Sequence, residues 1–192
     1  MNKLTKLITG AALASILASP AAAQQSISAT LSTHNTSVVR FERSTPNSFG
    51  FIDLTGDRHF DVMGIYGQAQ INQPLKGALK AGVDVNFGTD FDDRIGAQLA
   101  YSIGGAKGFA SVRAVKFLTN DSPPRIGYAG AYNLGRVNLS TWGSVDFAKD
   151  GVTQLGELEA AVRTVRDIDA LVRVEHYPWS GWAVQAGIKR KF

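Results

Sequence analysis

Charged and polar side chains occupy every second position in several segments of this sequence. Lys80 and Asp84 alternate with apolar residues between positions 79 and 87, and Arg173 does so between positions 167 and 177. Because successive side chains of a strand point to opposite faces, each such set shares one face. We expect this face to line the interior of a barrel, at Lys80, Asp84, Gln98, Arg113, Trp142, Asp146, Glu157, Glu159, Arg163, Arg173, Glu175, Gln185 and Lys189.

This polar set carries both signs of charge. Opposed acidic and basic groups create a transverse field, and a polar lining lets small hydrophilic solutes exchange hydration for side-chain contacts. The alternative is that the charges pair with one another and fill a narrow lumen. Trp142 stands close to Ser144 and Asp146. With Tyr66 it could stack a nucleobase or a sugar, or it could only fill space.

A second chemistry is hydrolysis near the last hairpin. His176 could act as a base for Ser180, with Glu175 orienting the imidazole. Pro178 and a turn separate the two groups, so the competing interpretation is an ordinary hairpin loop. We expect a protein that is not an enzyme, with an outer-membrane lipid hydrolase as the alternative.

Metal and cofactor chemistry has little support in the sequence. There is no Cys, which leaves neither a disulfide framework nor a thiolate metal site. The acidic run Asp90, Asp92 and Asp93 could bind Ca²⁺ weakly or contact lipopolysaccharide through divalent ions, or it could be a solvated loop. We therefore expect no metal site and no cofactor.

The elements that would position these residues are strands. Apolar and polar residues alternate over 79–87, 94–103, 126–134, 137–147, 167–177 and 181–192, and short turn clusters separate the segments. Counting weaker segments predicts an all-β, antiparallel up-and-down transmembrane β-barrel of about twelve strands. Without the weak segments 37–43 and 48–54 the count falls to ten. The registers of these two segments and of 108–118 stay open.

The connections between the segments predict which end of the barrel faces outward. Transmembrane barrels have short periplasmic turns and longer outer loops. We expect outer loops at Gly88–Asp93, Thr119–Pro124, Ala148–Gln154 and His176–Ser180, and periplasmic turns at Gln73–Lys76, Gly104–Gly108, Leu134–Arg136 and Arg166–Asp167.

Alternation alone does not say which face is outside, because a soluble barrel would turn its apolar face inward. Small or charged residues on the second face and aromatic residues near strand ends favour lipid outside. The aromatic residues expected in interfacial girdles are Phe51, Phe60, Phe87, Tyr101, Phe117, Phe147, Tyr177, Trp179 and Trp182.

Both ends of the chain support an outer-membrane barrel. The alternating segment 181–192 ends on Phe192, which is typical of the closing strand that the barrel-assembly machinery recognises in bacterial outer membranes. Arg190 lies on its apolar face and should sit at the periplasmic rim, where a charge costs little. Residues 1–23 read as a Sec signal peptide cleaved after Ala23, which leaves a single barrel domain over 24–192.

Charge excludes a nucleic-acid partner. Lys3 and Lys6 leave with the signal peptide, so 18 of the 20 basic residues face 16 acidic ones, without any basic block. The expected partners are outer-membrane lipid and lipopolysaccharide, the assembly machinery and small hydrophilic solutes of a Gram-negative envelope.

Two stretches resemble a known family. FGFIDLTGDRHFDVMGIYGQAQINQPLKGAL at Phe49–Leu79 and GRVNLSTWGSVDF at Gly135–Phe147 are similar to strands of the nucleoside-specific, Tsx-like channels, although Gln68 stands where that family more often has an acidic residue. The resemblance implies a barrel with a nucleoside as solute. The expected function is a small passive pore, with a structural barrel without channel activity as the alternative.

Overall fold

The computed structural model describes residues 24–45, 47–89, 93–119, 122–178 and 180–192. Residues 1–23, assigned above to a signal peptide, lie outside the described residues. Twelve strands are present: β1 (Gln24–Ser32), β2 (Thr36–Ser44), β3 (Ser48–Asp57), β4 (Val62–Lys76), β5 (Leu79–Gly88), β6 (Arg94–Gly105), β7 (Gly108–Phe117), β8 (Arg125–Asn133), β9 (Val137–Ala148), β10 (Gly151–Val165), β11 (Ile168–Tyr177) and β12 (Gly181–Lys191).

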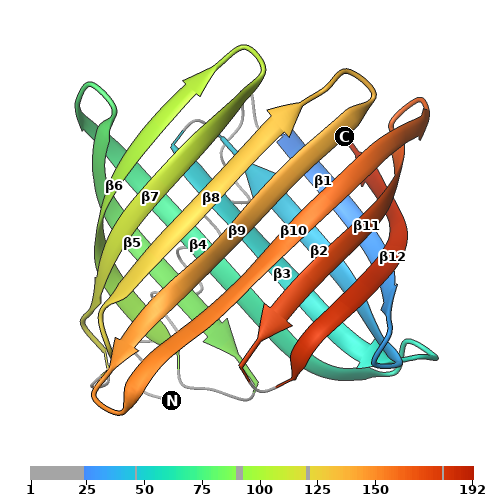
Figure 1. Cartoon of the computed structure of the whole chain (residues 1–192), viewed down its shortest axis with the longest axis horizontal. Helices are drawn as coiled ribbons and strands as arrows, with labels where there is room; N and C mark the ends of the chain where they lie inside the picture. Colours follow the sequence, from blue (N-terminus) through green and yellow to red (C-terminus); the bar gives the residue numbers. More distant parts are fainter. Residues whose placement is uncertain (1–23, 46, 90–92, 120–121, 179) are drawn as a thin grey trace.

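The strands form one closed antiparallel barrel in which each strand pairs with its neighbours in sequence (Figure 1). β1 and β12 close the ring, with Thr30 opposite Gly187 and Ser28 opposite Lys189. Closure leaves the sheet without an edge strand. The predicted fold class is confirmed at twelve strands rather than ten, because the weak segments form β2 and β3. No helix in the described part of the chain is long and apolar enough to cross a membrane.

The two ends of the barrel differ in their connections. One end, called here the turn end and uppermost in Figure 1, carries the start of β1, the end of β12 and the connections 45–47, 77–78, 106–107, 134–136 and 166–167. The other, the loop end, carries 33–35, 58–61, 89–93, 118–124, 149–150 and 178–180. The loop end holds the longer connections, as predicted.

Two of the predicted connections are wrong. The outer loop expected at Ala148–Gln154 is a two-residue turn, because β9 and β10 pair up to Ala148 and Gly151. The turn expected at Gln73–Lys76 is strand, since β4 continues to Lys76 past a register shift after Pro74. Such a shift lets a strand accommodate a proline that cannot donate a ladder hydrogen bond.

Polar residues face inward and apolar residues face outward. Asp84, Arg173 and Gln185 are almost fully buried inside the barrel, whereas Leu158 and Val172 are about half exposed on its outer face. This arrangement is the reverse of the one expected for a soluble barrel, in which the apolar face turns inward. It also settles the open register of β7, where Arg113, Val115 and Phe117 are buried.

The aromatic girdle is smaller than expected. Phe51, Phe117 and Tyr177 belong to the inward set, because they pair with inward residues Gln68, Gly96 and Gly181. Phe60, Phe87, Tyr101, Phe147 and Trp182 lie on the outward side or in a turn. Trp179 lies outside the described residues. The inward or outward direction of a side chain follows from the alternation along its strand. Where both faces of a strand carry aromatic residues, the sequence does not show which aromatic residues point outward.

One outward aromatic ring covers two glycines of neighbouring strands. Tyr128 of β8 lies over Gly143 of β9 and Gly156 of β10, where a Cβ atom at Gly156 would stand 2.5 Å from the Tyr128 hydroxyl. Glycine at these positions lets the ring pack flat against the sheet.

Candidate functional site in the barrel interior

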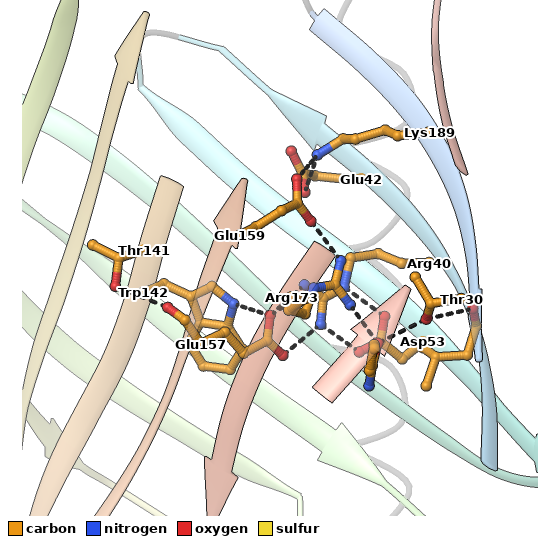
Figure 2. Close-up of polar contacts among 12 residues, drawn as sticks. Thr30, Arg40, Glu42, Asp53, Thr141, Trp142, Glu157, Glu159, Arg173 and Lys189 are labelled. Carbon is orange, nitrogen blue, oxygen red and sulfur yellow. Dashed lines mark hydrogen bonds and ion pairs between the residues drawn. The ribbon is translucent and has the colours of Figure 1, made fainter. Parts of the chain in front are cut away.

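The centre of the interior is organised around Arg40 of β2 (Figure 2). Its Nε and Nη2 atoms donate to the two carboxylate oxygens of Asp53 on β3, each at 2.7 Å. Its Nη1 and Nη2 atoms also donate to Glu157 of β10, at 2.7 and 2.9 Å. Three strands separate β2 from β10 around the ring, so this contact crosses the lumen. Arg40 thus ties two distant parts of the wall together.

Glu157 receives further donors. The indole Nε1 of Trp142 donates to it at 2.8 Å and the hydroxyl of Tyr177 at 2.7 Å. The Nε of Arg173 lies 3.5 Å from its Oε2. A buried carboxylate is tolerated only when it is paired and hydrogen-bonded, and Glu157 meets both conditions.

The network continues toward the turn end through Arg173. Its Nη2 donates to Glu159 at 2.8 Å, and its Nη1 donates to Gln185 at 3.3 Å. Lys189 donates to the other oxygen of Glu159 at 3.1 Å and lies 3.6 Å from Glu42. The hydroxyl of Thr30 also donates to Gln185, at 2.7 Å. We call the following residues the central network: the ten labelled in Figure 2, which are Thr30, Arg40, Glu42, Asp53, Thr141, Trp142, Glu157, Glu159, Arg173 and Lys189, together with Tyr177 and Gln185.

A second network occupies the other half of the wall. Arg125 of β8 donates to both oxygens of Asp146 on β9, at 2.6 and 2.9 Å, and to Asn86 of β5 at 3.1 Å. Asn86 and Gln68 both donate to the buried carboxylate of Asp84. Arg113 lies 3.6 Å from the same carboxylate. Each carboxylate of this network therefore faces at least one arginine.

Aromatic rings join the two networks across the barrel. Phe51 of β3 packs against Trp142 of β9 with ring centroids 5.4 Å apart, and against Tyr66 of β4 at 5.5 Å. Five strands separate β3 from β9 on either side, so the Phe51–Trp142 contact spans the full width of the lumen. The Arg40 guanidinium lies 4.4 Å from the centroid of the Phe51 ring. At this level the side chains meet in the middle of the barrel.

The sequence-predicted residues all lie on the inward side of their strands. Trp142, Glu157, Glu159, Arg173, Gln185 and Lys189 come together in the central network, and Asp84, Arg113 and Asp146 in the second one. Gln98 donates to Asn72 at 2.8 Å, and Glu175 faces Glu157 across β10 and β11. Lys80 is half-buried opposite Ala100, and Arg163 is exposed at the turn end, away from both networks.

Three residues of the two networks, Arg40, Asp53 and Arg125, were not among those predicted to line the interior. Arg40 and Asp53 stand opposite each other across the β2–β3 hairpin, in the two segments whose register stayed open. The alternation of Arg40 and Glu42 with Val39 and Phe41 was an available signal. Arg125 follows a proline-rich connection at the first position of β8, where no alternation precedes it.

The hydrolase arrangement is not formed. His176 points outward and stacks on Trp182 with ring centroids 4.8 Å apart, whereas the adjacent Glu175 belongs to the inward face. Glu175 cannot orient the imidazole from the opposite side of the sheet. Among the described residues no cluster of His, Cys, Asp or Glu could hold a metal ion. Asp90 and Asp92 of the acidic loop lie outside the described residues.

Comparison with known proteins finds matches to the fold but not to the sequence. No protein-family model and no curated protein matches the sequence. Among solved structures, the KdgM porin has a TM-score of 0.60 at 6% identity, with 88% of this chain and 99% of that chain covered. The NanC porin has a TM-score of 0.61 at 8% identity, covering 88% and 100%. A second KdgM structure, in complex with disordered oligogalacturonate, has a TM-score of 0.57 at 8% identity, covering 88% and 99%.

These likenesses concern the fold, which is that of porin barrels. They give no support to the nucleoside-specific channel family that Phe49–Leu79 and Gly135–Phe147 resemble, so the nucleoside stays a prediction.

Proposed function

We propose that this chain is an outer-membrane β-barrel that forms a narrow passive pore for small hydrophilic solutes. The observation that carries the proposal is an interior lined by charged groups of both signs inside a wall whose outer face is apolar. The likeness to porin barrels supports it. Insertion into the membrane and conduction of solutes are both part of this proposal.

The outer face supports the membrane location. Exposed Leu99, Ile103, Leu158, Val172 and Ile188 would face water at a large cost in a soluble protein, whereas lipid accepts them. The strands have 9 to 15 residues, which suffices to cross a bilayer when they are tilted. With the turn end in the periplasm, the longer connections would lie outside the cell.

The interior limits what such a pore could pass. Phe51, Trp142, Arg40 and Glu157 meet at one level, and we expect the passage to be narrowest there. A twelve-stranded barrel lies between filled eight-stranded barrels and wide sixteen-stranded porins. We therefore expect a small conductance controlled by this constriction, and a solute selected by size and charge.

Planar-bilayer recording on refolded protein tests the pore. The wild type should give small conductance steps, and Trp142→Ala should enlarge them several-fold because it removes one side of the constriction. Phe147→Ala, an aromatic truncation on the outer face of the same strand, is the matched control and should leave the conductance unchanged. Heat-modifiable gel mobility shows that each variant has inserted as a barrel.

A structural barrel is the second candidate, because the Phe51–Trp142 contact spans the lumen. A wild type that inserts correctly but shows no conductance step would overturn the pore and favour this candidate. Competition by nucleosides in the same recordings tests the solute. A nucleoside that leaves the current unchanged removes that prediction without affecting the pore.

Phe192 is proposed as the signal for barrel assembly. Its ring is exposed on the outward side and its backbone N–H donates to Gln25 at 3.0 Å. Phe192→Ala should lower the fraction of heat-modifiable barrel assembled in cells several-fold, while the unfolding free energy of the refolded variant changes little. An equal loss in both measurements would indicate a structural role instead.

A further inference from the structure

The outer face of the barrel is hollowed near the turn end. The hollow has a volume of about 550 Å³ and spans β6 to β10. Its floor is made by small residues, Ala110, Gly130 and Thr141, and larger residues flank them, Ile103, Tyr132, Leu139 and Leu158. It is a shallow depression that is open to the outside, not an enclosed cavity. The lining is almost entirely apolar, so the hollow suits a hydrocarbon chain.

Basic residues surround the same end of the wall. Lys107, Arg136 and Arg166 lie in the three turns 106–107, 134–136 and 166–167, and all three are exposed. Exposed Arg190 of β12 extends the row on the outer face, and exposed Arg163 of β10 lies at the same end on the inward side. Asp167, 3.6 Å from Arg166, is the acidic member of these turns. We call Lys107, Arg136, Arg163, Arg166 and Arg190 the basic rim.

The loop end carries no comparable excess of positive charge. Its described connections contain the basic residues Arg58 and Lys149 and the acidic residues Asp61, Asp93 and Asp150. The barrel is therefore electrostatically polarised along its axis, with positive charge gathered at the turn end. A charge of this kind attracts anionic headgroups at a membrane surface.

The hollow and the basic rim meet at two adjacent turns. Gly108 lines the hollow and directly follows Lys107, while Leu139 lines it three residues after Arg136. The Lys107 carbonyl accepts from Asn133 at 2.7 Å, which holds the first turn against the strand that leads into the second. The Nη2 of Arg136 donates to the carbonyl of Arg163 at 3.3 Å, and in the described residues neither Lys107 nor Arg136 forms an ion pair with a carboxylate. The charge of both exposed side chains is therefore not neutralised within the described part of the chain.

We propose that this place is a binding site for one anionic phospholipid. The acyl chain lies in the hollow over Ala110 and Gly130, and the phosphate is bound by Lys107 and Arg136. The site rests on the proposed membrane insertion but not on conduction. Charge complementarity favours an anionic headgroup over a zwitterionic one, because the second charge of a zwitterion would face the same two cations.

Native mass spectrometry of the refolded wild type in neutral detergent, titrated with phosphatidylglycerol or with phosphatidylcholine of the same chains, tests the headgroup. We expect one phosphatidylglycerol to bind at least tenfold more tightly than phosphatidylcholine. The double variant Lys107→Gln/Arg136→Gln should lose about 10- to 30-fold of that affinity, since each cation near the headgroup contributes roughly fivefold. Arg58→Gln/Lys149→Gln, which removes two cations at the loop end, should lose none.

A second variant tests the hollow separately from the charge. Ala110→Leu fills the floor and should weaken both lipids while preserving the preference for phosphatidylglycerol. Equal binding of the two lipids by the wild type would overturn the proposal, as would a similar loss in the Arg58→Gln/Lys149→Gln control. Because the titration does not depend on current, a silent barrel could still bind the lipid, and a conducting barrel could fail to bind it.

Discussion

Glu157 is the residue on which most donors of the interior converge. Arg40, Trp142 and Tyr177 donate to it, and Arg173 lies within ion-pair distance. Such a carboxylate is stable only while its partners neutralise it. Removing a member of a buried pair leaves an uncompensated charge, whereas an exposed pair contributes little.

Glu157→Gln should therefore lower the unfolding free energy by about 3 to 5 kcal/mol, since Arg40 and Arg173 lose a shared counter-charge. Urea unfolding of the refolded barrel in lipid vesicles, followed by tryptophan fluorescence, measures this. Glu42→Gln is the control, because Glu42 lies 3.6 Å from Lys189 at a more exposed site, and should cost about 0 to 1 kcal/mol. A cost of Glu157→Gln no larger than about 1 kcal/mol would contradict the stabilising role of Glu157.

At the level of the strands, a large side chain on the outer face of one strand packs over small residues of its neighbours. Tyr128 of β8 covers Gly143 and Gly156, so three consecutive strands share one ring. The hollow over Ala110 and Gly130 contrasts with this arrangement, because there the small residues line a depression of the outer face.

Gly156→Ala should destabilise the barrel by about 1 to 3 kcal/mol, the usual cost of overpacking, because the new methyl group meets the Tyr128 hydroxyl. In a Tyr128→Ala background the same change should cost much less. A double-mutant cycle of unfolding free energies measures the coupling. Independent, additive costs would show that the ring does not pack on Gly156.

Element boundaries also explain which connections were predicted correctly. The turn at Arg166–Asp167 was predicted correctly. Asp167 has a positive φ of 64°, which Asp tolerates in a turn. The segment Ala148–Gln154 was not, because its polar residues form the ends of two long strands. Pairing between β9 and β10 satisfies the backbone there whatever the side chains are.

At the scale of the whole molecule, the barrel turns its apolar residues out and its charges in. Arg190, like Lys116 of β7, is a charged residue on the outer face. It lies next to the turn end, with its guanidinium 5.1 Å from the centroid of the Phe192 ring. A charged group near the interface can reach the headgroup region, while one at the midplane cannot.

Val172→Arg, at the middle of β11 on the outer face, should therefore cost about 2 to 4 kcal/mol of unfolding free energy in vesicles. Arg190→Leu, on the outer face of the neighbouring β12 at the turn end, should change it by only about 0 to 1 kcal/mol. If Val172→Arg were as mild as Arg190→Leu, lipid would not surround the barrel at the level of Val172.

The alternation of polar and apolar residues along a strand can be recognised from the sequence without the structure. Alternation in β5, β6, β9, β11 and β12 depends only on the two-residue period of a strand, so it identified these strands and assigned Asp84, Asp146 and Arg173 to one face. It did not assign the faces of β2, β3 and β7, where apolar and polar residues occur on both.

Only the tertiary structure decided which face is the interior and which charges meet there. Closure of β1 on β12 places β2 across the lumen from β10 and β3 opposite β9. Arg40 thereby meets Glu157, 117 positions away in sequence, and Phe51 meets Trp142. These contacts depend on the curvature and register of the whole ring, and no local periodicity encodes them. For the same reason the hollow and the basic rim, assembled from adjacent strands and turns, became visible only in the closed barrel.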